Sequence, residues 1–177
     1  MFFSVIRRSG IKFSPVPLPI EKVILGTKPA LQFPTTPQDH MLLAEILLAN
    51  GFGGASSGQI WLSSSLQLKV LLRTHSVDVG SYFLKNAVVK LYLANCTTDK
   101  EFKSNWDAAY LAHVNSYKNT ELDLSEIEDW MVKSTNFCNT LYDIQMQGRF
   151  NKQELRNTLA KVGLDKQLID ISPDILE

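Results

Sequence analysis

The sequence has few cysteines, no net charge and no apolar run long enough to span a membrane. Its 177 residues include only Cys96 and Cys138, too few for a disulfide framework in a chain of this length, and their spacing fits no metal site. We therefore expect two reduced, partly buried thiols. Lysine plus arginine and aspartate plus glutamate each number 18, so the net charge is zero. This balance argues against a protein that wraps nucleic acid, which must neutralise many phosphates.

Membrane and export signals are also missing. The most apolar stretch, Val79–Ala94, is about 16 residues long and contains Lys85 and Lys90, whereas a spanning helix needs about 20 apolar residues. The apolar start Met1–Ile6 is too short for a signal-peptide core and precedes an arginine pair, which reverses the usual order of charge. We therefore expect neither a transmembrane helix nor a secretory signal.

Motifs that carry catalysis are absent as well. His40, His75 and His113 occur in different predicted environments, and none stands in a nucleophile motif. The glycine-rich stretch Gly51–Gly58 lacks the Gly-Lys-Ser/Thr ending of a phosphate-binding loop. We interpret the acidic stretch Glu121–Asp129 as a helix start, because acids favour the positive end of the helix dipole. The sequence therefore predicts a protein that is not an enzyme, with no catalytic residues, no metal and no cofactor.

Proline and positive charge are concentrated at the N-terminus. Residues 1–38 carry five basic residues against Glu21 alone, a net charge of +4, so the remainder carries −4. Proline fixes φ and pushes its predecessor toward extended geometry, so we predict an extended arm over residues 1–37 and a globular α+β domain over residues 38–177. Within the arm, Ile20–Leu25 is apolar and β-branched enough for an edge strand. Six of the seven prolines lie in this arm: Pro15, Pro17, Pro19, Pro29, Pro34 and Pro37.

The basic arm supplies the candidate binding residues. Arg7, Arg8 and Lys12 follow the aromatic start Met1–Phe3, and this combination suits contact with anionic lipid headgroups or RNA. A solvated tail is the plainer alternative. An arginine-bearing start without acids also matches a mitochondrial presequence, which import would remove.

The first half of the globular domain contains one well-marked helix and the predicted core. Thr36-Pro-Gln-Asp39 offers a capping threonine, a proline at the first helical position and an acid three residues on, so a helix should run through His40–Ala49. We then expect a flexible loop over Gly51–Gly58 and a long strand over Ile60–Arg73. After a polar break, Val79–Asn95 predicts a helix that is apolar almost all round and therefore buried.

The second half predicts further helices. Thr98–Glu101 is a capping-box pattern, and an aromatic stripe follows it at helical spacing. A helix starting at Ser125 should end near Ser134, whereas Cys138–Met146 fits a strand or a helix about equally. A final helix starts at the capping residue Asn151 and ends by Gly163. The aromatic stripe, interpreted as core, consists of Phe102, Trp106, Tyr110, His113 and Tyr117; the inward residues of the next helix are Ile127, Trp130 and Met131.

Two stretches resemble a known family. Gly148–Leu164 looks like the C-terminal helix of rhabdovirus matrix proteins, in the order of its Phe, Arg, Leu and closing Gly-Leu residues. Leu68–Thr74, followed by Asp78-Val79 and an apolar helix, is similar to the central strand and first helix of that family. The short chain and its basic, proline-bearing start are most similar to the small matrix proteins of plant cytorhabdoviruses.

The resemblance implies a structural virion protein with an α+β fold, in which helices pack on a twisted antiparallel sheet. Such a protein self-associates beneath the envelope, condenses the nucleoprotein–RNA complex and contacts anionic membrane and glycoprotein tails. It would be found in the virion, in host cytoplasm and on the inner face of host membranes. The Pro-Pro-x-Tyr budding motif of the animal viruses is absent. A mitochondrial accessory protein and a helical coat subunit of a plant virus are the alternatives.

Overall fold

Helices make up most of the molecule. The computed structural model describes residues 34–118 and 123–171. Two short strands, β1 (Val77–Asp78) and β2 (Ile169–Asp170), pair antiparallel. The helical elements are α2 (Pro37–Ala49), α3 (Gly53–Arg73), α4 (Tyr82–Ala87), the π-turn η1 (Val88–Tyr92), the 3₁₀ turn η2 (Leu93–Asn95), α5 (Phe102–Ser116), α6 (Leu124–Met146), α7 (Lys152–Ala160) and the 3₁₀ turn η3 (Asp165–Gln167).

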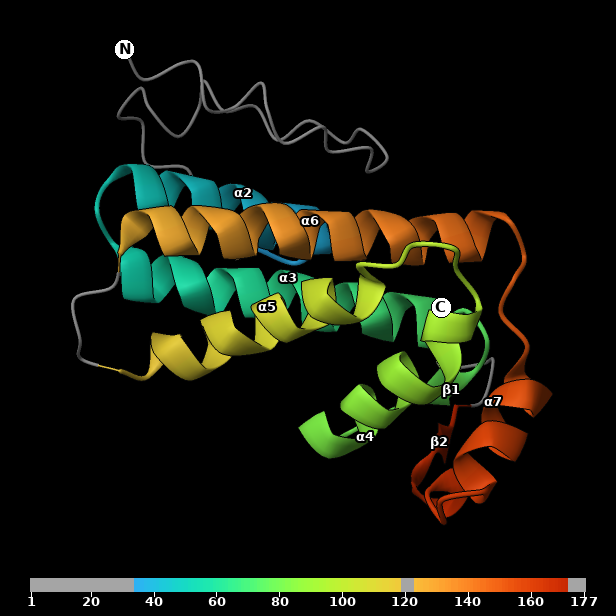
Figure 1. Cartoon of the computed structure of the whole chain (residues 1–177). Helices are drawn as coiled ribbons and strands as arrows, with labels where there is room; N and C mark the ends of the chain where they lie inside the picture. The colour runs from blue at the N-terminus through green and yellow to red at the C-terminus, as the bar shows by residue number, and fades with distance from the viewer. Residues whose placement is uncertain (1–33, 119–122, 172–177) are drawn as a thin grey trace.

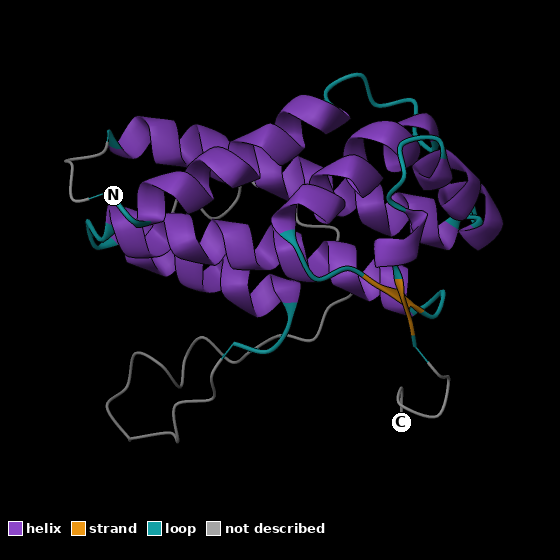
Figure 2. Ribbon diagram, turned by 90° about the horizontal axis from the view of Figure 1, so that it is seen from below, coloured by secondary structure: helices purple, strands orange, loops and turns teal. Residues whose placement is uncertain are grey.

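Four long helices form a bundle. In Figure 1, α2, α3, α5 and α6 run side by side, whereas α4, α7 and the two strands lie at one end of the bundle. Helix α3 is central, because it packs against α2, α5 and α6. Figure 2 shows how small the sheet is beside the helices. The mixed α+β content is therefore mostly helix, and the described residues contain no larger twisted sheet.

The predicted strand over Ile60–Arg73 is wrong, because these residues form most of α3. Most of the predicted loop Gly51–Gly58 is also helical, since α3 begins at Gly53. Apolar residues occur on every side of α3, which packs against three neighbours, so its sequence has no single apolar face at helical spacing. Four serines of α3 are fully buried: Ser56, Ser57, Ser63 and Ser64. Small side chains of this kind let neighbouring helices approach closely.

Close approach is also visible at the start of α3. A Cβ atom added to Gly53 would lie 2.7 Å from Cδ1 of the fully buried Ile127 on α6. By contrast, a Cβ on Gly58 would lie 3.6 Å from Cβ of Ser116, an ordinary van der Waals contact. A side chain at position 53 would therefore displace Ile127, whereas one at position 58 would fit.

Local capping signals are confirmed at two helices. The side-chain oxygen of Thr36 accepts from the Asp39 N–H (3.1 Å), and the Asp39 carboxylate accepts from the Thr36 N–H (3.0 Å), which completes the capping box of α2. Asn151 Oδ1 accepts from the N–H groups of the second and third residues of α7. The prediction of a capping box over Thr98–Glu101 is wrong, because Glu101 is the N-cap of α5 and makes no side-chain capping hydrogen bond.

Helix α6 is longer than predicted. It does not end near Ser134 but continues to Met146, so the undecided segment Cys138–Met146 is helical. Its start is capped by Asp123, whose carboxylate accepts from the Ser125 N–H at 2.9 Å. The inward placement of Ile127, Trp130 and Met131 is confirmed, since all three are buried.

The apolar segment Val79–Asn95 is a helix from Tyr82 onward, interrupted by the π-turn. Ser81 caps it by accepting from the Leu84 N–H at 3.1 Å. The π-turn ends at Tyr92, which is 4% exposed. The Tyr92 hydroxyl accepts from the Asn151 N–H at 2.6 Å and donates to the Asn151 carbonyl at 3.0 Å, which fixes the start of α7 against this segment.

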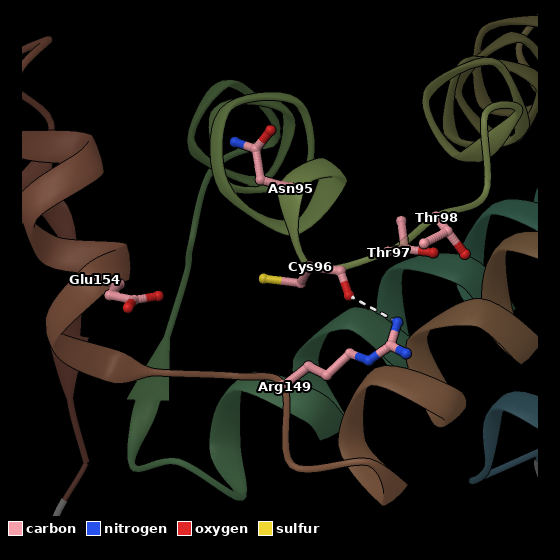
Figure 3. A pocket seen from close by; sticks show the side chains of 6 residues that line it. All are labelled: Asn95, Cys96, Thr97, Thr98, Arg149 and Glu154. Carbon is pink, nitrogen blue, oxygen red and sulfur yellow. Dashed lines mark hydrogen bonds between the residues drawn. The ribbon is translucent and has the colours of Figure 1, made fainter.

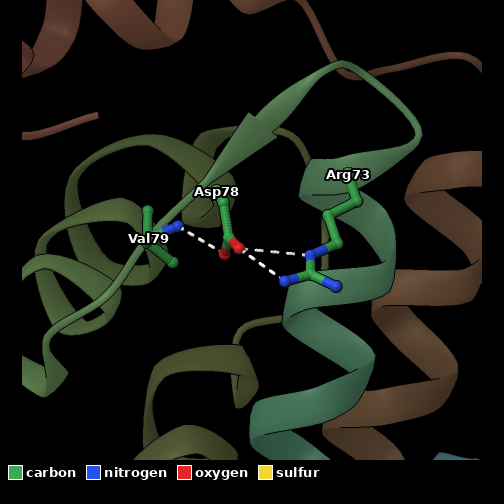
Figure 4. A network of polar contacts seen from close by, with 3 residues as sticks. All are labelled: Arg73, Asp78 and Val79. Carbon is green, nitrogen blue, oxygen red and sulfur yellow. Dashed lines mark hydrogen bonds and ion pairs between the residues drawn. The ribbon is translucent and has the colours of Figure 1, made fainter. Parts of the chain in front are cut away.

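A polar network joins α3 to the small sheet. Figure 4 shows the Asp78 carboxylate accepting from the Val79 N–H at 2.7 Å and from the Arg73 guanidinium at 2.7 Å. Burial raises the pKa of Asp78, but these hydrogen bonds and nearby cations outweigh it, so the pKa lies below its usual value. On the other strand, Asp170 forms ion pairs with Lys152 (2.8 Å) and with Arg156 of α7.

Candidate functional site

The predicted anion-binding residues Arg7, Arg8 and Lys12 lie outside the described residues, as does the predicted edge strand Ile20–Leu25. What the structure provides is the point where this segment meets the bundle. Pro34 leads into the capping residue Thr36 at the start of α2. The basic segment is therefore attached at one end of one bundle helix.

The histidines take part in packing at three separate places. His40 Nδ1 lies 2.7 Å from Gln59 Oε1 and ties α2 to α3. The rings of His75 and His113 stack on aromatic rings, at centroid distances of 4.2 Å from Phe150 and 4.7 Å from Trp61. Burial lowers the pKa of both stacked histidines. The structure does not bring the three rings together.

Of the predicted aromatic stripe on α5, the structure brings only part into the core. Phe102 and Trp106 are buried, and both lie against Phe137 of α6. Tyr117, at the end of the helix, is 77% exposed. The stripe is therefore core at its start and surface at its end.

Neither cysteine is arranged for chemistry. Both thiols are free, as expected; Cys138 is fully buried and burial raises its pKa to about 12. Burial also raises the pKa of the half-buried Cys96 thiol. Within residues 34–118 and 123–171, no three His, Cys, Asp or Glu side chains are grouped closely enough to hold a metal ion.

Cys96 lies in an open hollow of about 370 Å³ beside α7 (Figure 3). Arg149 extends toward this hollow, and its Nη1 is 3.5 Å from the Cys96 carbonyl oxygen. Glu154 lies on the opposite side, so the hollow contains one positive and one negative group and selects neither sign of charge. The remaining lining residues are Asn95, Thr97 and Thr98.

A buried amine is a feature that the sequence did not single out. Lys85, which is 8% exposed, donates from Nζ to Ser65 Oγ at 2.7 Å and lies 5.5 Å from the ring centre of Trp61. Burial, with a contribution from Lys69, lowers the pKa of this amine. The available signal was a charged residue within an apolar helix, but its partners are about 20 residues away in sequence.

Apolar side chains also lie on the outside of two neighbouring bundle helices, α2 and α3. Helix α2 buries Pro37, Met41, Ala44 and Leu48, yet four of its nine remaining positions are also leucine or isoleucine. Helix α3 likewise presents apolar side chains outward, with Leu62 43% and Val70 37% exposed. No helix in the described part of the chain is long and apolar enough to cross a bilayer.

Comparison with known proteins assigns no family. No protein-family model matches the sequence, and no curated protein and no solved structure matches it. The resemblance to rhabdovirus matrix proteins therefore stays a prediction.

Proposed function

We propose that this chain is a structural matrix protein of a virus particle, which self-associates, condenses the nucleoprotein–RNA complex and links it to an anionic membrane. The observation that carries the proposal is the separation of charge along the chain. Residues 1–38 carry a net charge of +4, and the remainder carries −4. A basic segment joined to a firmly packed helical body is suited to hold two different surfaces together.

The strength of the basic segment determines how it can act. Arg7, Arg8 and Lys12 would each contribute about 1 kcal/mol near an anionic membrane, or about 3 kcal/mol together. This free energy corresponds to weak, millimolar-range attachment of a single copy. Stable attachment therefore requires many copies acting together, so membrane binding and self-association belong to one function. Contact with a glycoprotein tail would add a further interaction at the same membrane.

The test uses the full chain and liposomes with and without anionic lipid. Replacing Arg7, Arg8 and Lys12 together with alanine should lower co-flotation with anionic liposomes at low salt by on the order of 100-fold. The matched control removes the same charge from exposed positions of the body, with Lys100, Lys103 and Lys161 replaced by alanine. The control variant should float almost as well as the unchanged protein.

Equal losses in the two triple variants would remove the N-terminal segment from the proposal, and so would binding that does not weaken with added salt. A strictly monomeric protein that ignores anionic lipid would overturn the proposal as a whole. Turnover of a small substrate would do the same.

A second function is favoured by one observation. Four long helices packed side by side, with a sheet of only two short strands, are the architecture expected of a helical coat subunit that binds RNA between its helices. Particles assembled from such a subunit would protect RNA from nuclease in the absence of membrane. Assembly that needs lipid and leaves RNA open to nuclease would favour the matrix function.

A further inference from the structure

An apolar surface runs across the outside of α2 and α3. We define the outer strip as Leu43 and Leu47 of α2 with Leu62, Leu66 and Val70 of α3. None of these five side chains is buried: Leu62 and Val70 are exposed, and the other three are half-buried. On each helix they recur at spacings of four residues, which places them on one face.

Hydrogen bonds show how the two rows are placed relative to each other. His40 precedes Leu43 by three residues and Gln59 precedes Leu62 by three, so each polar residue belongs to the same face as the apolar row that follows it. The His40 and Gln59 side chains are 2.7 Å apart. Ser63 also donates to the Pro37 carbonyl at 2.7 Å, which places the start of α2 beside the middle of α3. The two rows therefore lie on the same side of the bundle and run in opposite directions from the His40–Gln59 pair, which lies between them.

Exposed apolar side chains also occur on other helices of the described chain, such as Leu111 on α5 and Val132 on α6, but the exposed face of α6 is mostly charged. The outward side of α6 carries Glu126, Glu128, Asp129 and Lys133, and the Lys133–Asp129 ion pair lies on it. A surface helix normally buries one apolar face and leaves the opposite face polar. Helix α2 has apolar side chains on both, which is the pattern of an element that is covered on both sides.

The chain that precedes α2 is placed to provide the cover. The 33 residues before Pro34 join the bundle at the start of α2, which the Ser63–Pro37 bond places beside the strip. Residues 20–33 are rich in apolar side chains: Ile20, Val23, Ile24, Leu25, Leu31 and Phe33. The strip extends about seven residues along α2 and eleven along α3 from the His40–Gln59 bond, roughly 27 Å at 1.5 Å per residue. Fourteen residues reach that far in an extended conformation, at up to about 3.3 Å each.

We propose that residues 20–33 fold back onto the outer strip of the same chain. Attachment at Pro34 gives these residues a high effective concentration at the strip, which a separate molecule lacks. The apolar side chains of the segment then cover Leu43, Leu47, Leu62, Leu66 and Val70. Residues 1–19, with the basic group at positions 7–12, remain beyond the docked segment. The inference concerns the bundle alone and does not depend on membrane binding.

Photo-crosslinking of the full chain in lipid-free solution tests the proposal. A benzophenone amino acid at position 62 should crosslink to peptides from residues 20–33, whereas the same group at Leu111, exposed to 47% on α5, should not. Mixing nitrogen-15-labelled with unlabelled protein distinguishes docking within one chain from docking between two copies. Crosslinked peptides should carry a single label, because the segment docks on its own chain.

Substitutions in the strip complete the test. With the benzophenone at position 62, Leu66→Gln should lower the equilibrium constant for docking of residues 20–33 by roughly tenfold. The crosslink yield should fall by the same factor where docking is incomplete. Leu91→Gln, at a leucine exposed to 41% outside the strip, should leave the yield unchanged. Peptides carrying mixed labels would show that a second copy covers the strip and would overturn the proposal. Crosslinks that never reach residues 20–33 would overturn it as well.

Discussion

Removing one hydroxyl group should loosen α7 from the bundle. The Tyr92 hydroxyl makes two hydrogen bonds to the backbone of Asn151, accepting at 2.6 Å and donating at 3.0 Å. Phenylalanine at position 92 keeps the ring, which lies edge-on to Phe150 at 5.4 Å, and loses only the polar contacts. The Tyr92→Phe variant therefore isolates what the hydroxyl contributes.

The Asn151 carbonyl and the Asn151 N–H are affected differently when the Tyr92 hydroxyl is removed. The Asn151 carbonyl also accepts from the Leu155 N–H at 3.0 Å, so it keeps a partner. The Asn151 N–H has Tyr92 as its partner, but Asn151 is an exposed residue, so water can partly replace the hydroxyl. Each hydrogen bond contributes about 0.5–1.5 kcal/mol net, and a solvated donor avoids the full cost of an unpaired one. We expect the free energy of unfolding to fall by about 1–2 kcal/mol.

Urea denaturation followed by circular dichroism measures this loss, and native-state hydrogen exchange locates it. Amides of α7 should exchange faster in the variant, whereas those of α3 and α6 should change less. Tyr142→Phe is the matched control, because no described residue bonds to the half-buried Tyr142 hydroxyl. A Tyr92→Phe loss below about 0.5 kcal/mol, or one equal to that of the control, would refute the assignment of a clamp to this hydroxyl.

Three further predictions concern charge, thiols and packing. Burial lowers the pKa of His113, so at a pH below about 6.5 this histidine binds a proton more readily in the unfolded chain than in the folded one. The free energy of unfolding should therefore drop as the pH falls from about 7.5 to about 5.5, and His113→Gln should make this pH dependence weaker. Iodoacetamide should modify Cys96 slowly in the native protein and Cys138 only after denaturation, as mass spectrometry would show. Gly58→Ala should raise the urea midpoint through about 0.5–1 kcal/mol of helix propensity, whereas Gly53→Ala should lower it.

Features set by neighbouring residues could be predicted from the sequence. The capping box at Thr36 and the cap at Asn151 are examples, because both partners lie within three residues of each other. The helix after Ser81 was also predicted, but it is not buried on all sides, because Phe83 is 63% and Leu91 41% exposed.

Features that depend on residues far apart in the sequence could not be predicted. Helix α3 was predicted as a strand because its apolar residues serve three packed helices and an outward strip, which together hide the helical period. Tyr92 and Asn151 are 59 residues apart in sequence, and no local pattern indicates that they bond. The outer strip was missed for a related reason: an apolar residue in a sequence carries no sign of whether its face is covered.

The candidate binding residues remain a prediction from sequence. Arg7, Arg8 and Lys12 lie outside the described residues, so the structure places only their point of attachment. The apolar outer strip near that point is what the structure adds. The N-terminal segment can therefore be considered in two parts, an apolar part that could cover this strip and a basic part that could bind anions.

The capping box of α2 has a geometric consequence for any ordered array. Thr36 has an extended backbone, with φ −110° and ψ 158°, and the following proline has a restricted φ, so the peptide enters the helix along a set direction. Identical copies packed in one orientation would thus all deliver their leading residues to the same side. A layer built in this way has two chemically different faces without needing a second kind of subunit.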